Sequence, residues 1–248
     1  MTILNTNDQY LVELKLQGVR DSLAHRLKAA QDQNLGYEEF LGLCLFDELE
    51  YRRGSRVKRL IYNASFRSMA TPEGVDFGAA RNLDKKQIAD LATSRFVNDG
   101  HNLLIIGPTG VGKSYLATAV AMAACRNRRS TMFFRMNNLI EKLALVRAAG
   151  TYLNFLKKLG NVDLVVLDDF GIKPLQPHQY QDLYDILEER METKSTIVTT
   201  QLPEENWSEV IDDPVTCEAI TRRIVEKAIR IELKGKPYAK KGKAIDRN

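Results

Sequence analysis

Residues 102–118 read NLLIIGPTGVGKSYLAT, and the segment from Gly107 to Ser114 satisfies the pattern GxxxxGK[ST]. An apolar run precedes the pattern and a helix-favouring run follows it, as a phosphate-binding loop between a strand and a helix requires. Glycines let backbone N–H groups turn towards phosphates, and the helix N-terminus adds a positive dipole. The segment therefore predicts an α/β fold with a nucleotide site. We expect the nucleotide contacts at Gly107, Pro108, Thr109, Gly110, Val111, Gly112, Lys113, Ser114 and Tyr115.

Two carboxylates follow a second apolar run about fifty residues downstream. Residues 164–167 read LVVL and lead directly into Asp168 and Asp169, which is typical of the Walker B strand that completes a P-loop site. We expect ATP and Mg²⁺ as cofactors. Lys113 is expected to reach the β- and γ-phosphates, and Ser114 and Asp168 to hold Mg²⁺, with Asp168 acting through water. Asp169 is expected to orient or deprotonate the attacking water.

A GTPase is the main rival interpretation of these carboxylates. Residues 168–171 read DDFG and fit the DxxG pattern of GTPases, but guanine recognition normally needs an NKxD sequence, and none occurs in the chain. ATP is therefore the better prediction. The later run TIVTT, residues 196–200, ends at the same predicted sheet edge, where Thr200 and Gln201 are positioned to hold the attacking water.

Short apolar runs alternate with helical patterns after residue 76, which predicts a mostly parallel sheet flanked by helices. The five predicted strands are 102–106, 131–135, 162–167, 196–200 and 229–233. The predicted helices are 84–97, 113–126, 139–148, 179–191 and 215–227.

The first 75 residues carry helical patterns and no strand signal. Apolar residues at positions 12, 16, 19, 23 and 27 predict one amphipathic helix that opens near Asn7 or Asp8, and a second helix is expected from 37 to about 69, before Pro72. We therefore expect a small all-helical N-terminal domain over 1–75, an ATPase domain over 76–235 and a basic tail over 236–248.

The composition of the 248 residues, 44% hydrophobic and 27% charged, is typical of globular proteins and excludes fibrous and disordered classes. No apolar run is long enough to span a membrane, and the polar start TILNTNDQ after Met1 predicts no signal peptide, so we expect a cytoplasmic protein without a membrane partner. The three cysteines and three histidines are scattered, which indicates neither a disulfide framework nor a zinc site.

Basic residues gather in two segments of a chain whose net charge is only +4. Residues 51–72 hold six basic residues and no acidic one, and residues 222–248 hold ten basic against three acidic residues. Both are candidate DNA contacts, although a solvated helix face or a loose tail would have the same composition. The predicted DNA-binding residues are Arg52, Arg53, Arg56, Lys58 and Arg59.

As a set, these motifs resemble the AAA+ ATPases and, more narrowly, the IstB-like transposition helper ATPases of bacterial insertion sequences, relatives of the helicase loader DnaC. The resemblance rests on GVRDSL, YEEFLGLCLFDELEYR, IIGPTGVGKSYLA, VVLDDFG, TIVTTQLP and RRIVEKAIRIELKGKPY. It implies a P-loop NTPase core with strand order 5-1-4-3-2 and nucleotide at the interfaces of a homo-oligomer. It also implies largely sequence-independent binding to double-stranded DNA and a partner transposase.

The resemblance also suggests an arginine finger on a helix late in the chain. Arg223 matches the family arginine that stabilises the transferred phosphoryl group from a neighbouring subunit, and Arg222 is second, although alone the pair would be a basic helix face. The expected catalytic set is thus Asp169, Lys113, Arg223 and Thr200.

Two features depart from the family pattern. Most AAA+ proteins have Glu where Asp169 stands, which suggests slow hydrolysis, and we expect no helical lid after the fifth strand. Two other functions stay open at this point. One is a DnaC-like replicative helicase loader, and the other is a non-enzymatic adaptor that binds ATP and hardly hydrolyses it.

Overall fold

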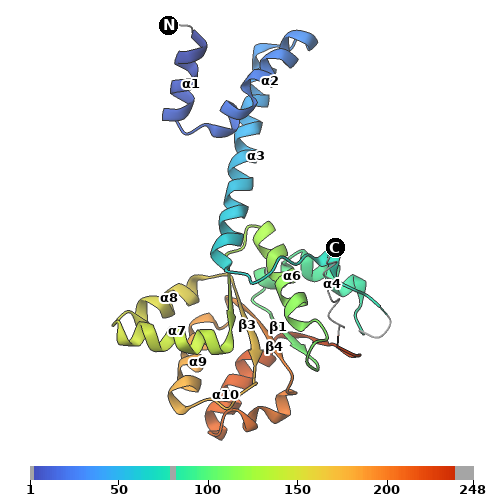
Figure 1. Cartoon of the computed structure of the whole chain (residues 1–248), viewed down its shortest axis with the longest axis vertical. Coiled ribbons are helices and arrows are strands. Elements are labelled where there is room, and N and C mark those ends of the chain that lie inside the picture. The colour runs from blue at the N-terminus through green and yellow to red at the C-terminus, as the bar shows by residue number, and fades with distance from the viewer. Residues whose placement is uncertain (1–2, 79–81, 238–248) are drawn as a thin grey trace, which may run out of the picture. The chain divides into compact units, whose positions relative to one another are not determined.

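The computed structural model describes residues 3–78 and 82–237. It contains two compact units, Met1–Arg59 and Leu60–Asn248 (Figure 1). Residues 60–75, which the sequence assigns to the N-terminal domain, include Ala70 and Val75 of the core of the second unit. Residues 238–248 of the predicted basic tail lie outside the described residues.

The first unit consists of α1 (Ile3–Glu13), α2 (Gln17–Gln33) and most of α3, whose full extent is Tyr37–Ala64. The prediction of one helix opening near Asn7 or Asp8 is wrong, because the chain starts α1 at Ile3 and leaves the helix after Glu13. Lys15 adopts a left-handed conformation with φ of 56° in the break. The regular spacing of apolar residues that predicted one helix therefore runs through two consecutive helices.

Glu48 of α3 stabilises the new helix start. Its Oε2 accepts hydrogen bonds from the N–H groups of Gly18 (2.7 Å) and Val19 (3.3 Å), and so satisfies two donors at the N-terminus of α2. Glycine is required there because a Cβ on Gly18 would lie 2.6 Å from the backbone oxygen of Asp47. Arg26 donates two hydrogen bonds of 2.7 Å to Asp47, which further joins α2 to α3.

The second helix also ends earlier than predicted. It stops at Ala64 rather than near 69, because Ser65 adopts φ of 58° and the following Phe66 packs edge-on against Phe133 at 6.1 Å. Tertiary packing, and not the later Pro72, therefore ends α3.

The second unit is built on one parallel sheet. Its strands are β1 (Asn102–Ile106), β2 (Thr131–Arg135), β3 (Leu164–Phe170), β4 (Ser195–Thr200) and β5 (Ala228–Glu232). The order β2-β3-β4-β1-β5, with every pairing parallel, confirms the predicted order 5-1-4-3-2. The prediction for the third strand is wrong at its end, since β3 continues through Asp168 and Asp169 to Phe170.

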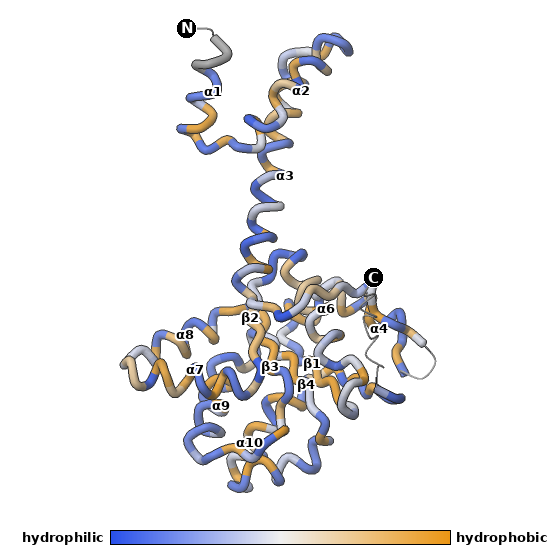
Figure 2. Tube along the Cα trace, in the orientation of Figure 1, coloured by the Kyte–Doolittle hydropathy of each residue, from blue (hydrophilic) through white to orange (hydrophobic). Residues whose placement is uncertain are grey.

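Helices cover both faces of this sheet (Figure 1). Leu103 and Ile105 of β1 face a core with α4 (Lys85–Ala92) and α6 (Lys113–Arg126), whereas Leu104 faces the opposite core. That second core contains residues of α7 (Met136–Ala148), α8 (Tyr152–Asn161), α9 (Pro177–Arg190) and α10 (Pro214–Val225). Because both faces are buried, the strands read as continuous apolar runs, and hydrophobic colour follows them in Figure 2.

Two helical predictions need correction. The helix expected over 84–97 is split into α4 and α5 (Arg95–Asn98), because Ser94 adopts φ of 61° between them. Helix α8 was not predicted, although Leu156 and Leu159 are spaced as one buried face. Short 3₁₀ turns at Pro72–Gly74 and Glu204–Glu209 complete the described elements. Within the described ranges, no helix is both long and apolar enough to cross a lipid bilayer.

Candidate nucleotide-binding site

The predicted phosphate-binding loop connects the carboxyl end of β1 to the first turn of α6, where the sequence places it. Two of its glycines adopt backbone conformations that other residues rarely adopt. Gly107 has φ of 157°, and a Cβ there would lie 2.5 Å from the backbone oxygen of Leu233; Gly112 precedes α6 with φ of 103°. Any larger residue at these two positions would distort the loop. The N-terminus of α6 thereby opens onto the sheet edge, where it attracts phosphate.

Lys113 is buried at the start of α6. Its Nζ donates hydrogen bonds to the backbone oxygens of Gly107 (2.7 Å) and Pro108 (2.8 Å). The ammonium group therefore links the end of the loop to its first two residues. Burial lowers the pKa of Lys113, while the charges of Asp169 and Asp168 oppose that shift. The lysine and the two carboxylates therefore share one electrostatic site, as the sequence predicts.

Asp168 is buried at the end of β3 and is held by a residue that the sequence analysis missed. Thr199 of β4 donates a hydrogen bond of 2.6 Å from its Oγ1 to Asp168 Oδ1. The same hydroxyl accepts a hydrogen bond of 3.0 Å from the backbone N–H of Asp169. One threonine thus orients both carboxylate residues. The signal that could have identified it is its place beside Thr200 at the end of the neighbouring strand.

Asp169 lies at an irregularity in the sheet. The pairing of β3 with β4 shifts register between Leu167 and Phe170, and Asp169 adopts φ of 63° there, which turns the residue out of the regular strand. Burial and the neighbouring Asp168 raise the pKa of the Asp169 carboxyl, and the positive charges of Arg135, Lys113 and Arg67 oppose that rise. Arg135, at the end of β2, forms an ion pair with Asp169 at 3.4 Å.

Thr200 and Gln201 both lie at this sheet edge, with different contacts. The Thr200 hydroxyl accepts a hydrogen bond from the Leu202 N–H (3.0 Å) and is also 3.3 Å from the Leu202 oxygen, so it stabilises the turn after β4. Gln201 accepts a hydrogen bond of 2.7 Å from Thr109 Oγ1, which links β4 to the phosphate-binding loop. A catalytic role for Thr200 stays a prediction.

An apolar pocket adjoins the loop and was only partly foreseen. Tyr115, a predicted nucleotide contact, lines it, and a Cβ on Gly74 would lie 2.4 Å from the Tyr115 hydroxyl oxygen. A pocket with apolar walls next to a phosphate site suits the flat face of a nucleotide base. Its other lining residues are Val75, Asp76, Leu83, Val111, Gly112, Leu116 and Leu233.

The site offers oxygen ligands for Mg²⁺. Ser114 lies in the first turn of α6, and Asp168 presents a carboxylate that accepts a hydrogen bond from Thr199. Hydroxyl and carboxylate oxygens are what Mg²⁺ prefers, with phosphate oxygens and water completing its shell. Within the described ranges, no three His, Cys, Asp or Glu residues cluster as a ready-made metal cage.

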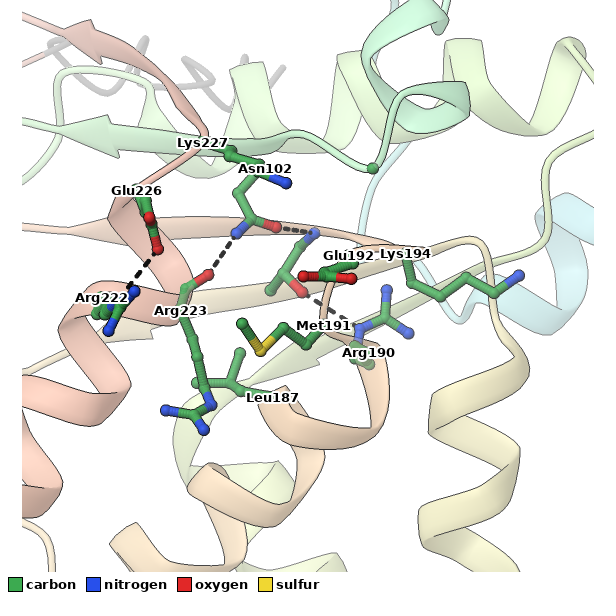
Figure 3. Close-up of a pocket in the computed structure, with 12 residues that line it drawn as sticks. Asn102, Leu187, Arg190, Met191, Glu192, Lys194, Arg222, Arg223, Glu226 and Lys227 are labelled. Carbon is green, nitrogen blue, oxygen red and sulfur yellow. Dashed lines mark hydrogen bonds and ion pairs between the residues drawn. The ribbon is translucent and has the colours of Figure 1, made fainter.

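The predicted finger lies at the opposite end of the sheet. Asn102, the first residue of β1, donates hydrogen bonds to the backbone oxygens of Arg223 (2.8 Å) and Ile224 (3.0 Å), whereas the phosphate-binding loop follows the last residue of β1. The strand separates the two by roughly 13 Å. Arg223 pairs with Glu188, with Nε at 2.7 Å, and lies 4.4 Å from the ring centre of Tyr184. Figure 3 shows Arg222 and Arg223 lining the same pocket, with Arg222 paired to Glu226 at 3.2 Å.

All five predicted DNA-binding residues are exposed on α3, within a hydrophilic stretch (Figure 2). Arg52 pairs with Glu48 and Arg53 pairs with Glu50, each at 2.6 Å. Among the described residues, Arg56, Lys58 and Arg59 have no ion-pair partner. The acidic residues just before the basic segment therefore neutralise part of it.

The chain is similar to a known family and to known relatives. The family described as IstB-like ATP binding protein matches residues 9–245. The putative insertion sequence ATP-binding protein y4pL of Sinorhizobium fredii (strain NBRC 101917 / NGR234) is 38% identical over 220 residues, 89% of this chain and 90% of the relative.

Solved structures show the same fold. The crystal structure of the DnaC helicase loader aligns with a TM-score of 0.54 at 23% identity, over 70% of this chain and 98% of that one. AMPPCP-bound DnaA from Aquifex aeolicus aligns with a TM-score of 0.58 at 17% identity, over 68% of this chain and 51% of that one. At these identities the likeness concerns the fold alone, which is that of the expected AAA+ core.

Proposed function

The chain belongs to the IstB-like ATP-binding protein family, and from this membership we propose that it is an ATP-dependent DNA-binding helper of transposition. In this proposal it oligomerises on duplex DNA with ATP bound and recruits or activates a partner transposase at the target. The observation that carries the proposal is a complete P-loop and Walker B site inside a family match that extends over both units. The insertion-sequence name of the y4pL relative supports transposition over helicase loading.

The nucleotide chemistry follows from the site. The loop N–H groups and the N-terminus of α6 bind the phosphates, and Lys113 exchanges its carbonyl partners for the β- and γ-phosphates. Ser114 and, through water, Asp168 would hold Mg²⁺, which would supply positive charge to those phosphates. Asp169 orients the attacking water and accepts its proton, and its raised pKa suits a proton acceptor.

Subunit contact completes the site in this proposal. Because Arg223 lies at the far end of β1 from its own phosphate-binding loop, it serves a neighbouring subunit. ATP at the interface then favours assembly, and hydrolysis dissolves it. DNA contacts come from arginine and lysine on phosphates, so affinity should be largely independent of sequence and fall steeply with salt.

The test is the oligomeric state measured by mass photometry with duplex DNA, comparing ATP, ADP and the Lys113→Ala variant at one salt concentration. We expect a DNA-bound oligomer with ATP only, and none with Lys113→Ala, because that variant loses the phosphate contact. Monomers only, or assembly that needs single strands and a helicase, would move the helicase-loader function to first place. A phosphate-release assay on the same samples separates an ATPase from an adaptor that binds ATP without hydrolysis.

A further inference from the structure

A second basic feature of the ATPase unit is a pocket beside the edge strand β2, here called the β2 pocket. Its charged lining residues are Arg67, which follows α3, Arg135 of β2, Lys142 of α7 and Lys158 of α8. No acidic residue lines it, although the chain as a whole is nearly balanced with 36 basic and 32 acidic residues. The four cations come from four separate segments, so they do not form a basic run that could be recognised in the sequence.

These charges are poorly compensated. Among the described residues, Lys142 and Lys158 have no ion-pair partner, and both side chains are exposed. Arg135 meets Asp169 only as an ion pair at 3.4 Å, and its buried Nε has no hydrogen-bond acceptor. Asp169 compensates Arg135 and, more weakly, Arg67, so the two lysines carry most of the uncompensated charge, and an anion in the hollow would relieve the repulsion among the cations. The β2 pocket is therefore suited to an anionic ligand.

The rest of the lining favours a nucleic-acid backbone over a small anion. Phe134 and Phe155 meet edge to face at 6.3 Å and form an apolar wall, while Asn63 and Asn138 add neutral amide groups. Lys142 and Lys158 are exposed on α7 and α8, so the positive lining extends out of the pocket, where successive phosphates of a strand can follow it. Apolar walls accommodate the sugars between those phosphates.

We propose that the β2 pocket is a second DNA-backbone site, located in the ATPase unit and separate from the basic residues of α3. This inference rests on the proposed DNA-binding function and specifies where in the second unit the phosphates are held. The contacts involve phosphate alone, so the pocket contributes affinity and salt dependence without sequence preference.

The test measures binding of a fluorescent duplex to the full chain by anisotropy, with a non-hydrolysable ATP analogue, over a range of salt concentrations. The variant Lys142→Gln/Lys158→Gln removes two pocket charges. We expect its affinity to fall about tenfold at low salt and the slope of log affinity against log salt to decrease by about 2, since each phosphate contact contributes about 0.9. The variant Lys142→Arg/Lys158→Arg keeps the charges and should keep the slope.

The matched control is Lys86→Gln/Lys157→Gln, which loses the same charge from exposed lysines of α4 and α8 that do not line the pocket. The same slope in this control and in the pocket variant would overturn the inference. So would competition by pyrophosphate at the pocket with an unchanged slope for DNA, because the site would then hold a small anion only. If the unmodified chain fails to bind duplex at all, the proposed function fails first. Thermal melting followed by Trp207 fluorescence checks that each variant is folded.

Discussion

At the scale of the residue, the buried hydroxyl of Thr199 organises the proposed ATPase site. It donates to the Asp168 carboxylate and accepts from the Asp169 backbone, so the proposed metal ligand and the proposed base are held by the same group. Groups that orient ligands in this way commonly affect activity as strongly as some ligands do.

We predict that Thr199→Val lowers ATP turnover roughly 10- to 100-fold, because Asp168 loses its orienting donor. Thr199→Ser keeps the hydroxyl and should retain most of the activity. Steady-state phosphate release at saturating ATP and Mg²⁺ measures both. Unchanged turnover in Thr199→Val, together with a loss in Thr199→Ser, would mean that the methyl group, and not the hydrogen bonds, matters at this position.

A second residue-scale prediction concerns Asp47 in the first unit. Its hydrogen bonds with Arg26 hold the pKa of the Asp47 carboxyl at about 2, below its ordinary 3.8. Because the folded-state pKa is depressed, the stabilisation is complete above pH 4 and is lost as pH falls towards 2. We expect Asp47→Asn to lower the free energy of unfolding at pH 7, with a difference that shrinks between pH 4 and pH 2.

Urea unfolding followed by circular dichroism measures this difference. Trp207 is the one tryptophan of the chain and lies in the second unit, so its fluorescence reports on that unit alone. It should be insensitive to the Asp47→Asn change. A difference that does not vary with pH would show that the ion pair contributes nothing through titration.

At the scale of the element, α3 carries a basic face that its own acidic residues partly neutralise. Arg52 and Arg53 are paired with Glu48 and Glu50, whereas Arg56 and Arg59 lie three residues apart without ion-pair partners among the described residues. Arginines already engaged with carboxylates must give up those contacts to bind phosphate. The five predicted DNA contacts are therefore not equivalent.

We predict that Arg56→Gln/Arg59→Gln weakens duplex binding more than Arg52→Gln/Arg53→Gln does, and that it lowers the salt slope by about 2. Both double variants lose the same charge from the same helix, so each serves as the control for the other. Anisotropy titrations over a range of salt concentrations compare them. An identical slope in both variants and the unmodified chain would assign the DNA contacts elsewhere.

At the scale of the whole molecule, our proposal places each ATPase site between two copies of the chain. Arg223 lies at the amino end of β1 and the phosphate-binding loop lies at its carboxyl end. The two are therefore at opposite ends of the strands of one sheet. Arg223 is held by Glu188 and Tyr184 of its own chain, which keeps the guanidinium in place before assembly.

We predict that Asp169→Asn and Arg223→Ala each abolish hydrolysis, and that an equimolar mixture recovers it in part. In mixed oligomers, roughly a quarter of the interfaces combine an intact Asp169 with an intact Arg223 from the neighbour. The measurement is phosphate release on duplex DNA. Absence of recovery would place Arg223 in its own site or outside catalysis. Arg222 forms an ion pair with Glu226, and the Arg222→Ala variant is the control.

Local patterns were enough to predict the strand–loop–helix around Lys113, the five strands and, with the family resemblance, their order. Glycine positions and continuous apolar runs act over a few residues, and so they are visible in the sequence. The same local rules failed where contacts between residues distant in sequence determine the structure. At the break between α1 and α2, Glu48 caps the start of α2, thirty residues earlier in the chain.

The amino-acid sequence was enough to predict ATP binding, because the glycines and the lysine of the phosphate-binding motif lie within one short segment. Which polar and charged groups meet depends on the tertiary structure, which brings together Thr199 and Asp168, Arg135 and Asp169, and the four cations of the β2 pocket. Those residues come from strands and helices distant in the chain. Their contacts depend on sheet order and helix packing, which single-residue spacing does not encode.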